Sequence, residues 1–232
     1  MYMNEFNYIE NNYTALLEEV NRLSERLGTS VPTLVSVTKS GSDEELMALV
    51  RAGAVDIGEN RPGEVCRRGA LLREAGFAPR MHEIGTLQRN KIKLIADSVY
   101  MIHSVDSLRL AKDIDRHAAM NGRVIPILIE VNSAKEEQKS GVMPEDAERL
   151  LCEISELSSV KVCGLMTMGP ATDDGEVLRP YFRNTQKLFD ELNTRYGFGD
   201  SPTLSMGMSD SWQVAVEEGS TLIRVGRRLF IR

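Results

Sequence analysis

Lys39 stands directly after a short apolar run, residues 33–38, whose β-branched side chains predict a buried strand. The residues that follow predict a helix, because Ser42 and Glu45 form a capping-box pattern. The lysine is therefore expected at the carboxyl end of a strand, which is where parallel α/β folds bind ligands. If it is partly shielded from water there, its amine can lose a proton and attack a carbonyl carbon. The alternative for one isolated lysine is a solvated surface charge.

Two segments near the end of the chain carry groups that suit an anion. Ser209 precedes a predicted short helix, residues 210–218, and could cap a helix end that attracts negative charge. Gly226 follows the last predicted strand and would let backbone N–H groups approach a ligand, with the positive charge of Arg227 beside it. In (β/α)8 enzymes the loops after the last two strands frequently bind phosphate. An ordinary N-cap, a turn glycine and a solvated arginine are the alternatives.

A nucleophilic lysine beside a phosphate site favours a phosphorylated aldehyde as the ligand. Pyridoxal 5′-phosphate (PLP) is the cofactor that proteins hold in this way, as an internal aldimine, here on Lys39. Arg224 belongs to the last predicted strand and is expected to point into the mouth of the fold. A guanidinium that faces the ring nitrogen of the cofactor would keep that nitrogen unprotonated, and the ring would then be a weak electron sink.

Eight predicted strands alternate with helices after an N-terminal amphipathic helix over residues 4–27. The strands are expected at residues 33–38, 54–57, 81–84, 98–102, 124–131, 160–166, 203–205 and 222–225. The helices are expected near residues 43–52, 62–75, 88–96, 107–120, 144–157, 177–195 and 210–218. This α/β alternation predicts parallel strands, and their number favours a closed (β/α)8 TIM barrel over an open doubly wound sheet. We find no linker, so residues 1–232 are expected to form a single domain. The long polar loops 132–142 and 167–176 both follow strands and are expected on the ligand-binding face.

The composition is ordinary for a globular protein, with 232 residues, 42% hydrophobic and 27% charged. A net charge of −6 offers no basic footprint for nucleic acid. The three cysteines are widely spaced, form no metal pattern and, without a secretory signal, indicate a reducing compartment. No stretch approaches the roughly 20 apolar residues of a membrane span. We expect a cytoplasmic protein without nucleic-acid or membrane partners.

The sequence resembles the pyridoxal phosphate homeostasis protein family over nearly its whole length, residues 5–230. The matching motifs, in family order, are VSVTK at 35–39, GEN at 58–60, HEIG at 82–85, QRNK at 88–91, KSG at 139–141, GLM at 164–166, SMGMS at 205–209, GST at 219–221 and RVG at 224–226. Each motif is short, but their shared order is specific. The resemblance implies a fold-type-III PLP protein, whose barrel is similar to the N-terminal domain of alanine racemase.

The resemblance also implies roles for single residues. Lys39 matches the cofactor lysine, Ser209 and Gly226 match the residues that hold the phosphate, and Arg224 matches the arginine near the pyridine nitrogen. These assignments agree with the chemistry expected from the residues alone. The cofactor implied is PLP, and no metal is implied.

Asn60 and His82 match family positions near the cofactor, and His82 is therefore expected at the barrel mouth, with a satisfied core histidine as the alternative. Three positions depart from the family pattern. Ser211 stands where an aspartate is usual, Arg227 where a threonine is usual and Arg61 where an aromatic residue is usual. The missing threonine removes a hydroxyl donor to the phosphate, which the charge of Arg227 or backbone N–H groups would replace.

The predicted function is PLP storage and transfer within PLP homeostasis, without classical enzymatic turnover. Racemases and decarboxylases of this fold type carry a second β domain with a catalytic tyrosine, whereas this chain stops just past its eighth predicted strand. We therefore expect a monomeric carrier whose further partners are apo PLP-dependent enzymes. A PLP-dependent, racemase-like amino-acid enzyme is one alternative, and a cofactor-free Schiff-base aldolase is the other.

Overall fold

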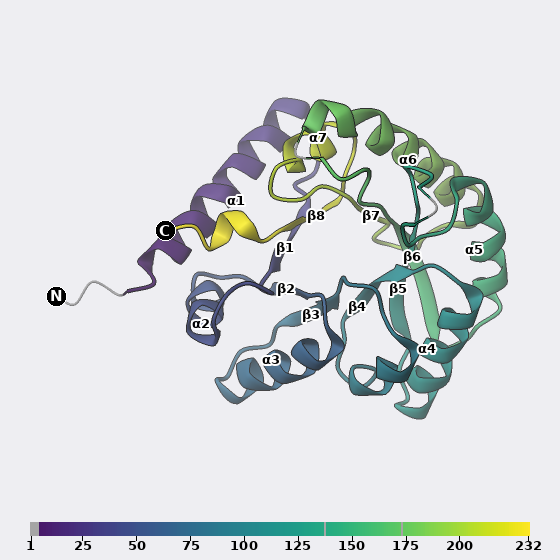
Figure 1. The fold of residues 1–232 in the computed structure, drawn as a ribbon, viewed down its shortest axis with the longest axis horizontal. Helices are drawn as coiled ribbons and strands as arrows, with labels where there is room; N and C mark the ends of the chain where they lie inside the picture. Colours follow the sequence, from purple (N-terminus) through teal and green to yellow (C-terminus); the bar gives the residue numbers. More distant parts are fainter. Residues whose placement is uncertain (1–4, 137, 173) are drawn as a thin grey trace.

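Eight parallel strands close a barrel in sequence order, β1 to β8 (Figure 1). The computed structural model describes residues 5–136, 138–172 and 174–232. Its strands are β1 Thr33–Val37, β2 Asp56–Glu59, β3 Arg80–Glu83, β4 Met101–Val105, β5 Ile125–Glu130, β6 Val160–Met166, β7 Thr203–Ser205 and β8 Leu222–Val225. The barrel closes where β1 pairs with β8, from Thr33 opposite Leu222 to Ser36 opposite Val225. The predicted (β/α)8 barrel is confirmed.

Helices surround the strands as an outer ring (Figure 1). They are α1 Asn7–Leu27, α2 Asp43–Arg51, α3 Pro62–Glu74, α4 Leu108–Met120, α5 Ala147–Ser155, α6 Gly175–Tyr196 and α7 Trp212–Glu217, with 3₁₀ turns η1 Arg89–Leu94, η2 Pro144–Asp146 and η3 Arg227–Leu229. The extra N-terminal helix α1 packs against α2, α7 and η3. Its Asn12 Nδ2 donates to the carbonyls of Leu229, at 3.2 Å, and Ile231, at 2.8 Å, and so holds the end of the chain against the ring.

The apolar core lies mainly between the strands and the helices, because each parallel strand is covered on its outer face. The barrel interior is different. One part of it is a small apolar cluster of Met101, Leu128 and Met166. Other interior positions carry polar side chains, which matter for the site below. No helix in the described part of the chain is long and apolar enough to cross a membrane.

After β3, two elements differ from the prediction in kind or in position. The predicted helix 88–96 is the 3₁₀ turn η1, and the fourth strand lies at Met101–Val105 instead of 98–102. The Val99 N–H donates to the Ile95 carbonyl at 2.7 Å, which keeps this segment in the turn, and pairing with β3 begins only at Met101. As a result His103, predicted to follow the strand, lies within it.

Candidate functional site

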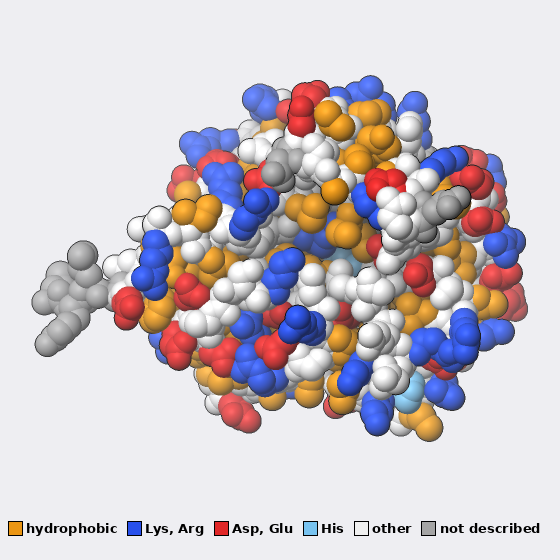
Figure 2. Space-filling model, in the orientation of Figure 1, with side chains coloured by type: hydrophobic (Ala, Val, Ile, Leu, Met, Phe, Trp, Pro, Cys, Tyr) orange, Lys and Arg blue, Asp and Glu red, His pale blue; other side chains and the backbone are white. Residues whose placement is uncertain are grey.

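A cavity of about 530 Å³ opens among the carboxyl ends of the strands, within the size range of small-molecule sites. We call it the mouth pocket. Six of the seven predicted site residues line it: Lys39, Asn60, Ser209, Arg224, Gly226 and Arg227. Figure 2 shows the molecule in the orientation of Figure 1, with a hollow near its centre and Lys or Arg side chains around and inside that hollow.

Lys39 lies in the turn that follows β1 and lines the mouth pocket. The turn is closed by the Gly41 N–H, which donates to the Thr38 carbonyl at 2.9 Å. The predicted strand-end position is confirmed, but Lys39 is exposed, so the condition of partial shielding from water is not met. The amine is therefore open to a ligand that arrives from solvent, and its placement depends on the turn rather than on burial.

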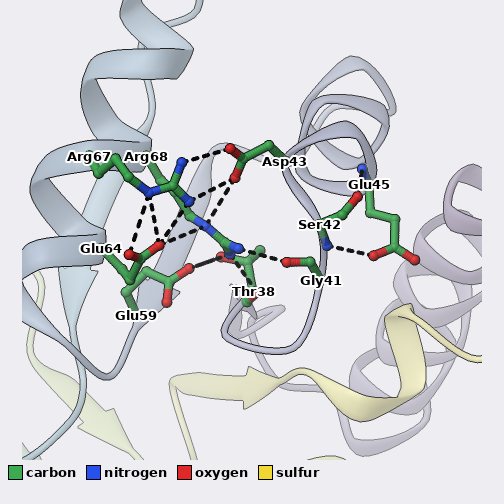
Figure 3. A network of polar contacts seen from close by, with 9 residues as sticks. All are labelled: Thr38, Gly41, Ser42, Asp43, Glu45, Glu59, Glu64, Arg67 and Arg68. Carbon is green, nitrogen blue, oxygen red and sulfur yellow. Dashed lines mark hydrogen bonds and ion pairs between the residues drawn. The ribbon is translucent and has the colours of Figure 1, made fainter.

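A buried arginine of α3 fixes that turn (Figure 3). The side chain of Arg68 is 7% exposed, and its Nη1 donates to the Thr38 carbonyl at 2.5 Å and to Glu59 Oε1 at 2.7 Å. Its Nη2 donates to the Gly41 carbonyl at 2.6 Å, while the Thr38 hydroxyl donates to the same Glu59 oxygen. One guanidinium thus holds both ends of the turn that presents Lys39.

Ser209 and Gly226 face each other across the loops after β7 and β8. The Gly226 N–H donates to Ser209 Oγ at 3.3 Å, so a hydroxyl and a backbone donor lie together at the pocket wall. A side chain at position 226 would bring its Cβ to 2.9 Å from the Val37 carbonyl oxygen, which explains why glycine is needed there. The predicted helix cap is wrong, because α7 begins two residues later and its N-cap residue is Ser211.

Arg224 brings a positive charge into the barrel interior, with 4% of its surface exposed. Its Nη1 donates to Ser205 Oγ at 2.5 Å and its Nη2 to the Thr167 carbonyl at 3.1 Å. Burial lowers the pKa of Arg224 to about 10, against the attraction of Glu130. The guanidinium therefore keeps its charge at neutral pH. A guanidinium has five N–H donors, so some are left for a ligand in the mouth pocket.

Asn60 contributes an amide to the mouth pocket. Its Oδ1 atom is buried and has no hydrogen-bond partner among the described residues. An unpaired buried acceptor is costly, unless a ligand or a water satisfies it. Asn60 is therefore suited to a ligand that brings a donor to this wall.

His82 does not line the mouth pocket, and the prediction that placed it at the barrel mouth is wrong. The ring is 1% exposed inside the barrel, where Nε2 lies 2.9 Å from Asp56 Oδ1 and Nδ1 lies 2.9 Å from His103 Nε2. The partner of its Nε2 atom, Asp56, is the first residue of β2, so the ring turns toward the amino end of the barrel. The alternative, a satisfied interior histidine, describes His82.

Comparison with known proteins identifies the relatives of this chain. Residues 12–231 match the alanine racemase, N-terminal domain family. The pyridoxal phosphate homeostasis protein of Aquifex aeolicus (strain VF5) is 39% identical over 93% of this chain and 94% of its own length. The chain belongs to the pyridoxal phosphate homeostasis protein family.

Solved structures agree with this membership. A protein of Bifidobacterium adolescentis described as unknown superposes with a TM-score of 0.90 at 34% identity, over 98% of this chain and 97% of that one. PipY of Synechococcus elongatus PCC7942, solved with PLP bound, superposes with a TM-score of 0.83 at 30% identity, over 96% of this chain and all of that one (100%). The whole barrel is shared with these proteins.

The positions at which this family member departs from the expected pattern have defined places. Ser211 is buried, and its Oγ accepts the Met208 N–H at 3.1 Å, which supports the loop before α7. Arg227 lies at the pocket rim with a side chain 66% exposed, and it pairs with Asp210. Arg61 is the N-cap residue of α3. Only Arg227 and Ser211 of these three line the mouth pocket.

Three groups of residues around the site were not predicted from the sequence. Ile84, Met168 and Met208 give the mouth pocket its apolar walls. Arg68 was not recognised as the support of the Lys39 turn, although its spacing of three from Val65 and four from Leu72 puts it on the buried face of α3. The polar residues of the interior, including His103, were missed because β4 was displaced in the prediction.

Proposed function

We propose that this protein binds PLP in the mouth pocket through a covalent bond to Nζ of Lys39, and that it stores PLP and delivers it within PLP homeostasis. One observation carries the proposal: a single cavity is lined by Lys39, by the Ser209–Gly226 donor pair and by Arg224. The names of the curated relatives and the PLP bound to PipY support it. The family fold alone would not support the proposal, because function depends on the residues of the site.

The donor set of the mouth pocket fits PLP. Lys39 offers an amine for the aldehyde, and the Ser209 hydroxyl, which accepts the Gly226 N–H, offers a donor for the phosphate, with the Arg227–Asp210 pair at the rim. Arg224 offers N–H donors to the ring nitrogen, and Asn60 offers an unsatisfied acceptor. When bound, the cofactor supplies an aldehyde that exchanges between amines. Because Lys39 is exposed, an incoming amine can reach it from solvent.

We propose further that the protein does not catalyse turnover of amino acids. Racemisation by two bases needs an acid–base group on each side of the substrate. Among the described residues that line the mouth pocket there is no tyrosine, histidine or cysteine, and Asp210 is paired with Arg227. These features support a carrier that hands PLP to apo PLP-dependent enzymes. The cytoplasmic location and the monomeric state expected from the sequence belong to the same proposal.

Titration of the cofactor-free protein with PLP, followed by absorbance, tests the proposal. We expect a visible band that saturates at one PLP per chain in the wild-type protein and is lost in Lys39→Ala. Lys93→Ala, at an exposed lysine of η1, is the matched control and should keep the band. A band that persists unaltered in Lys39→Ala would disprove the assignment of the lysine, and steady turnover of an amino acid by the pure protein would favour a racemase-like enzyme.

A further inference from the structure

Four polar side chains connect Arg224 with the opposite end of the barrel, and none of them lines the mouth pocket. Ser205 Oγ lies 2.5 Å from Arg224 Nη1 and 3.1 Å from His103 Nδ1. His103 Nε2 lies 2.9 Å from His82 Nδ1, and His82 Nε2 lies 2.9 Å from Asp56 Oδ1. Strands β2, β3, β4, β7 and β8 contribute one residue each, so the chain crosses the interior of the barrel.

All five residues are buried. Their exposed fractions are 7% for Asp56, 1% for His82, 0% for His103 and Ser205, and 4% for Arg224. Buried polar groups need hydrogen-bond partners. A buried network of this size destabilises the folded protein if any of its members is left without one. The arrangement therefore calls for an explanation beyond packing.

The two end groups of this hydrogen-bond chain, Arg224 and Asp56, fix the direction of every hydrogen bond within it. Burial alone would raise the pKa of Asp56, but hydrogen bonds from His82 and Arg80 outweigh that effect and hold the pKa below its usual value, so the carboxylate only accepts. Burial lowers the pKa of both His82 and His103, so both rings are neutral at pH 7. A neutral His82 that donates from Nε2 must accept at Nδ1.

The same reasoning continues toward the mouth. His103 must then donate from Nε2 and accept at Nδ1, where the Ser205 hydroxyl is its donor. Ser205 Oγ in turn presents a lone pair to Arg224, which has only donors. Each acceptor thus faces the arginine side, and the bonds run one way from the guanidinium to the carboxylate. This alignment leaves Arg224 Nη1 one orientation, while the Thr167 carbonyl fixes Nη2.

We propose that Ser205, His103, His82 and Asp56 are positioning residues for Arg224, and that their one-way hydrogen-bond chain holds its guanidinium toward the pyridine ring of the bound cofactor. The claim that the guanidinium faces the pyridine ring rests on the proposed function. The end of the hydrogen-bond chain that lies away from Arg224 borders a second cavity: Asp56 and His82 line a cavity of about 330 Å³ at the amino end of the barrel. His82 would then act on the cofactor from a distance, without touching it.

Nitrogen-15 spectra of the histidine rings in the full, cofactor-free protein test the chain directly. The sequence has only three histidines, and His117 on α4 supplies a signal outside the barrel interior. We expect His82 and His103 both to be neutral and protonated at Nε2 at pH 7. A proton on Nδ1 of either ring, or a charged ring, would overturn the proposal.

Ser205→Ala tests the link to Arg224. It should move the Nδ1 signal of His103, lower the affinity for PLP about tenfold, or about 1.4 kcal/mol, and shift the visible band of the bound cofactor. Ser36→Ala is the matched control, since the Ser36 hydroxyl is also buried on a barrel strand but has no partner among the described residues, and it should change none of these. An unchanged affinity and band in Ser205→Ala would overturn the positioning role. A wild-type protein that binds no PLP would overturn the proposed function instead, and the histidine signals of that sample would still decide the chain.

Discussion

At the scale of single residues, Arg224 differs from the exposed arginines of the outer helices because the barrel encloses its charge. Its pKa of about 10 and its bonds to Ser205 and Thr167 make it a fixed cation at the floor of the mouth pocket. A lysine in its place would present one point charge on a flexible stem, and burial would favour its neutral form.

We therefore expect Arg224→Lys to lower the affinity for PLP at least about tenfold, although it nominally preserves the charge. Titration followed by absorbance measures this change. Arg22→Lys, at a side chain of α1 that is 69% exposed, is the control and should bind as the wild type does. Equal affinities of Arg224→Lys and the wild type would contradict the role given to the guanidinium fork.

The residues found from sequence alone are those whose roles depend on where a strand ends. Gly226 follows β8 directly and Lys39 comes two residues after the end of β1, and a count along the sequence was enough to bring them to one pocket. The role of His82 depends on which way its side chain points along the barrel axis. Its partners Asp56 and His103 come from other strands, so a linear motif could not show that the ring turns away from the mouth.

At the scale of elements, the turn after β1 depends on α3. Arg68 and Arg67 are neighbours on that helix and belong to the same network (Figure 3), but their environments differ. Arg68 is buried against Glu59, whereas the side chain of Arg67 is 47% exposed and pairs with Asp43 and Glu64 at the surface. Breaking a buried pair leaves an uncompensated charge in the interior, while an exposed pair is screened by water.

Arg68→Ala should consequently lower the free energy of unfolding by about 3 kcal/mol, and Arg67→Ala by less than about 1 kcal/mol. Urea denaturation of both variants measures the difference. Arg68→Ala should also weaken PLP binding, because the turn that presents Lys39 loses the contacts at Thr38 and Gly41. Similar losses of stability in the two variants would show that the buried network does not hold the turn.

Strand positions were predicted best where apolar runs are bounded by turn residues. The last three strands have the bounds that the sequence predicted. The fourth strand was displaced because its polar residues, His103 and Ser104, resemble a strand end. In the barrel His103 is paired inside and the Ser104 hydroxyl donates to the Gly85 carbonyl at 2.5 Å, so both are strand residues. Local pattern cannot reveal partners that only the closed sheet provides.

At the scale of the whole molecule, the buried carboxyl of Glu83 on β3 makes the free energy of unfolding depend on pH. Burial raises the pKa of Glu83 to about 8, from 4.5, with a smaller effect of Glu59, against the hydrogen bond from the Gly85 N–H. Between these pH values the folded state binds more protons than the unfolded state. The contribution of Glu83 to the free energy of unfolding therefore falls as the pH rises from about 4.5 to about 8.

Glu83→Gln removes this titration. The variant should be close to the wild type in stability at pH 5 and more stable at pH 8, by on the order of 2 kcal/mol. Thermal or urea unfolding at the two pH values measures the difference, with Glu74→Gln as the control at an exposed carboxyl of α3. A stability difference between Glu83→Gln and the wild type that does not change with pH would contradict the raised pKa.

The barrel, its parallel sheet and the family were all predictable, because they follow from the alternation of elements and from the order of motifs. Two features were not predictable: the support of the Lys39 turn by Arg68, and the hydrogen-bond chain that ends at Arg224. Each joins residues from several strands or helices. Those contacts depend on the closed barrel.

The central claim is that PLP is bound covalently at Lys39. Borohydride treatment of the PLP-loaded protein, followed by peptide mapping, tests it most directly, because reduction makes the linkage permanent. The account predicts loss of the visible band and one modified peptide that carries the cofactor on Lys39. A reduced adduct on another lysine, or a protein that takes up no PLP at all, would contradict it.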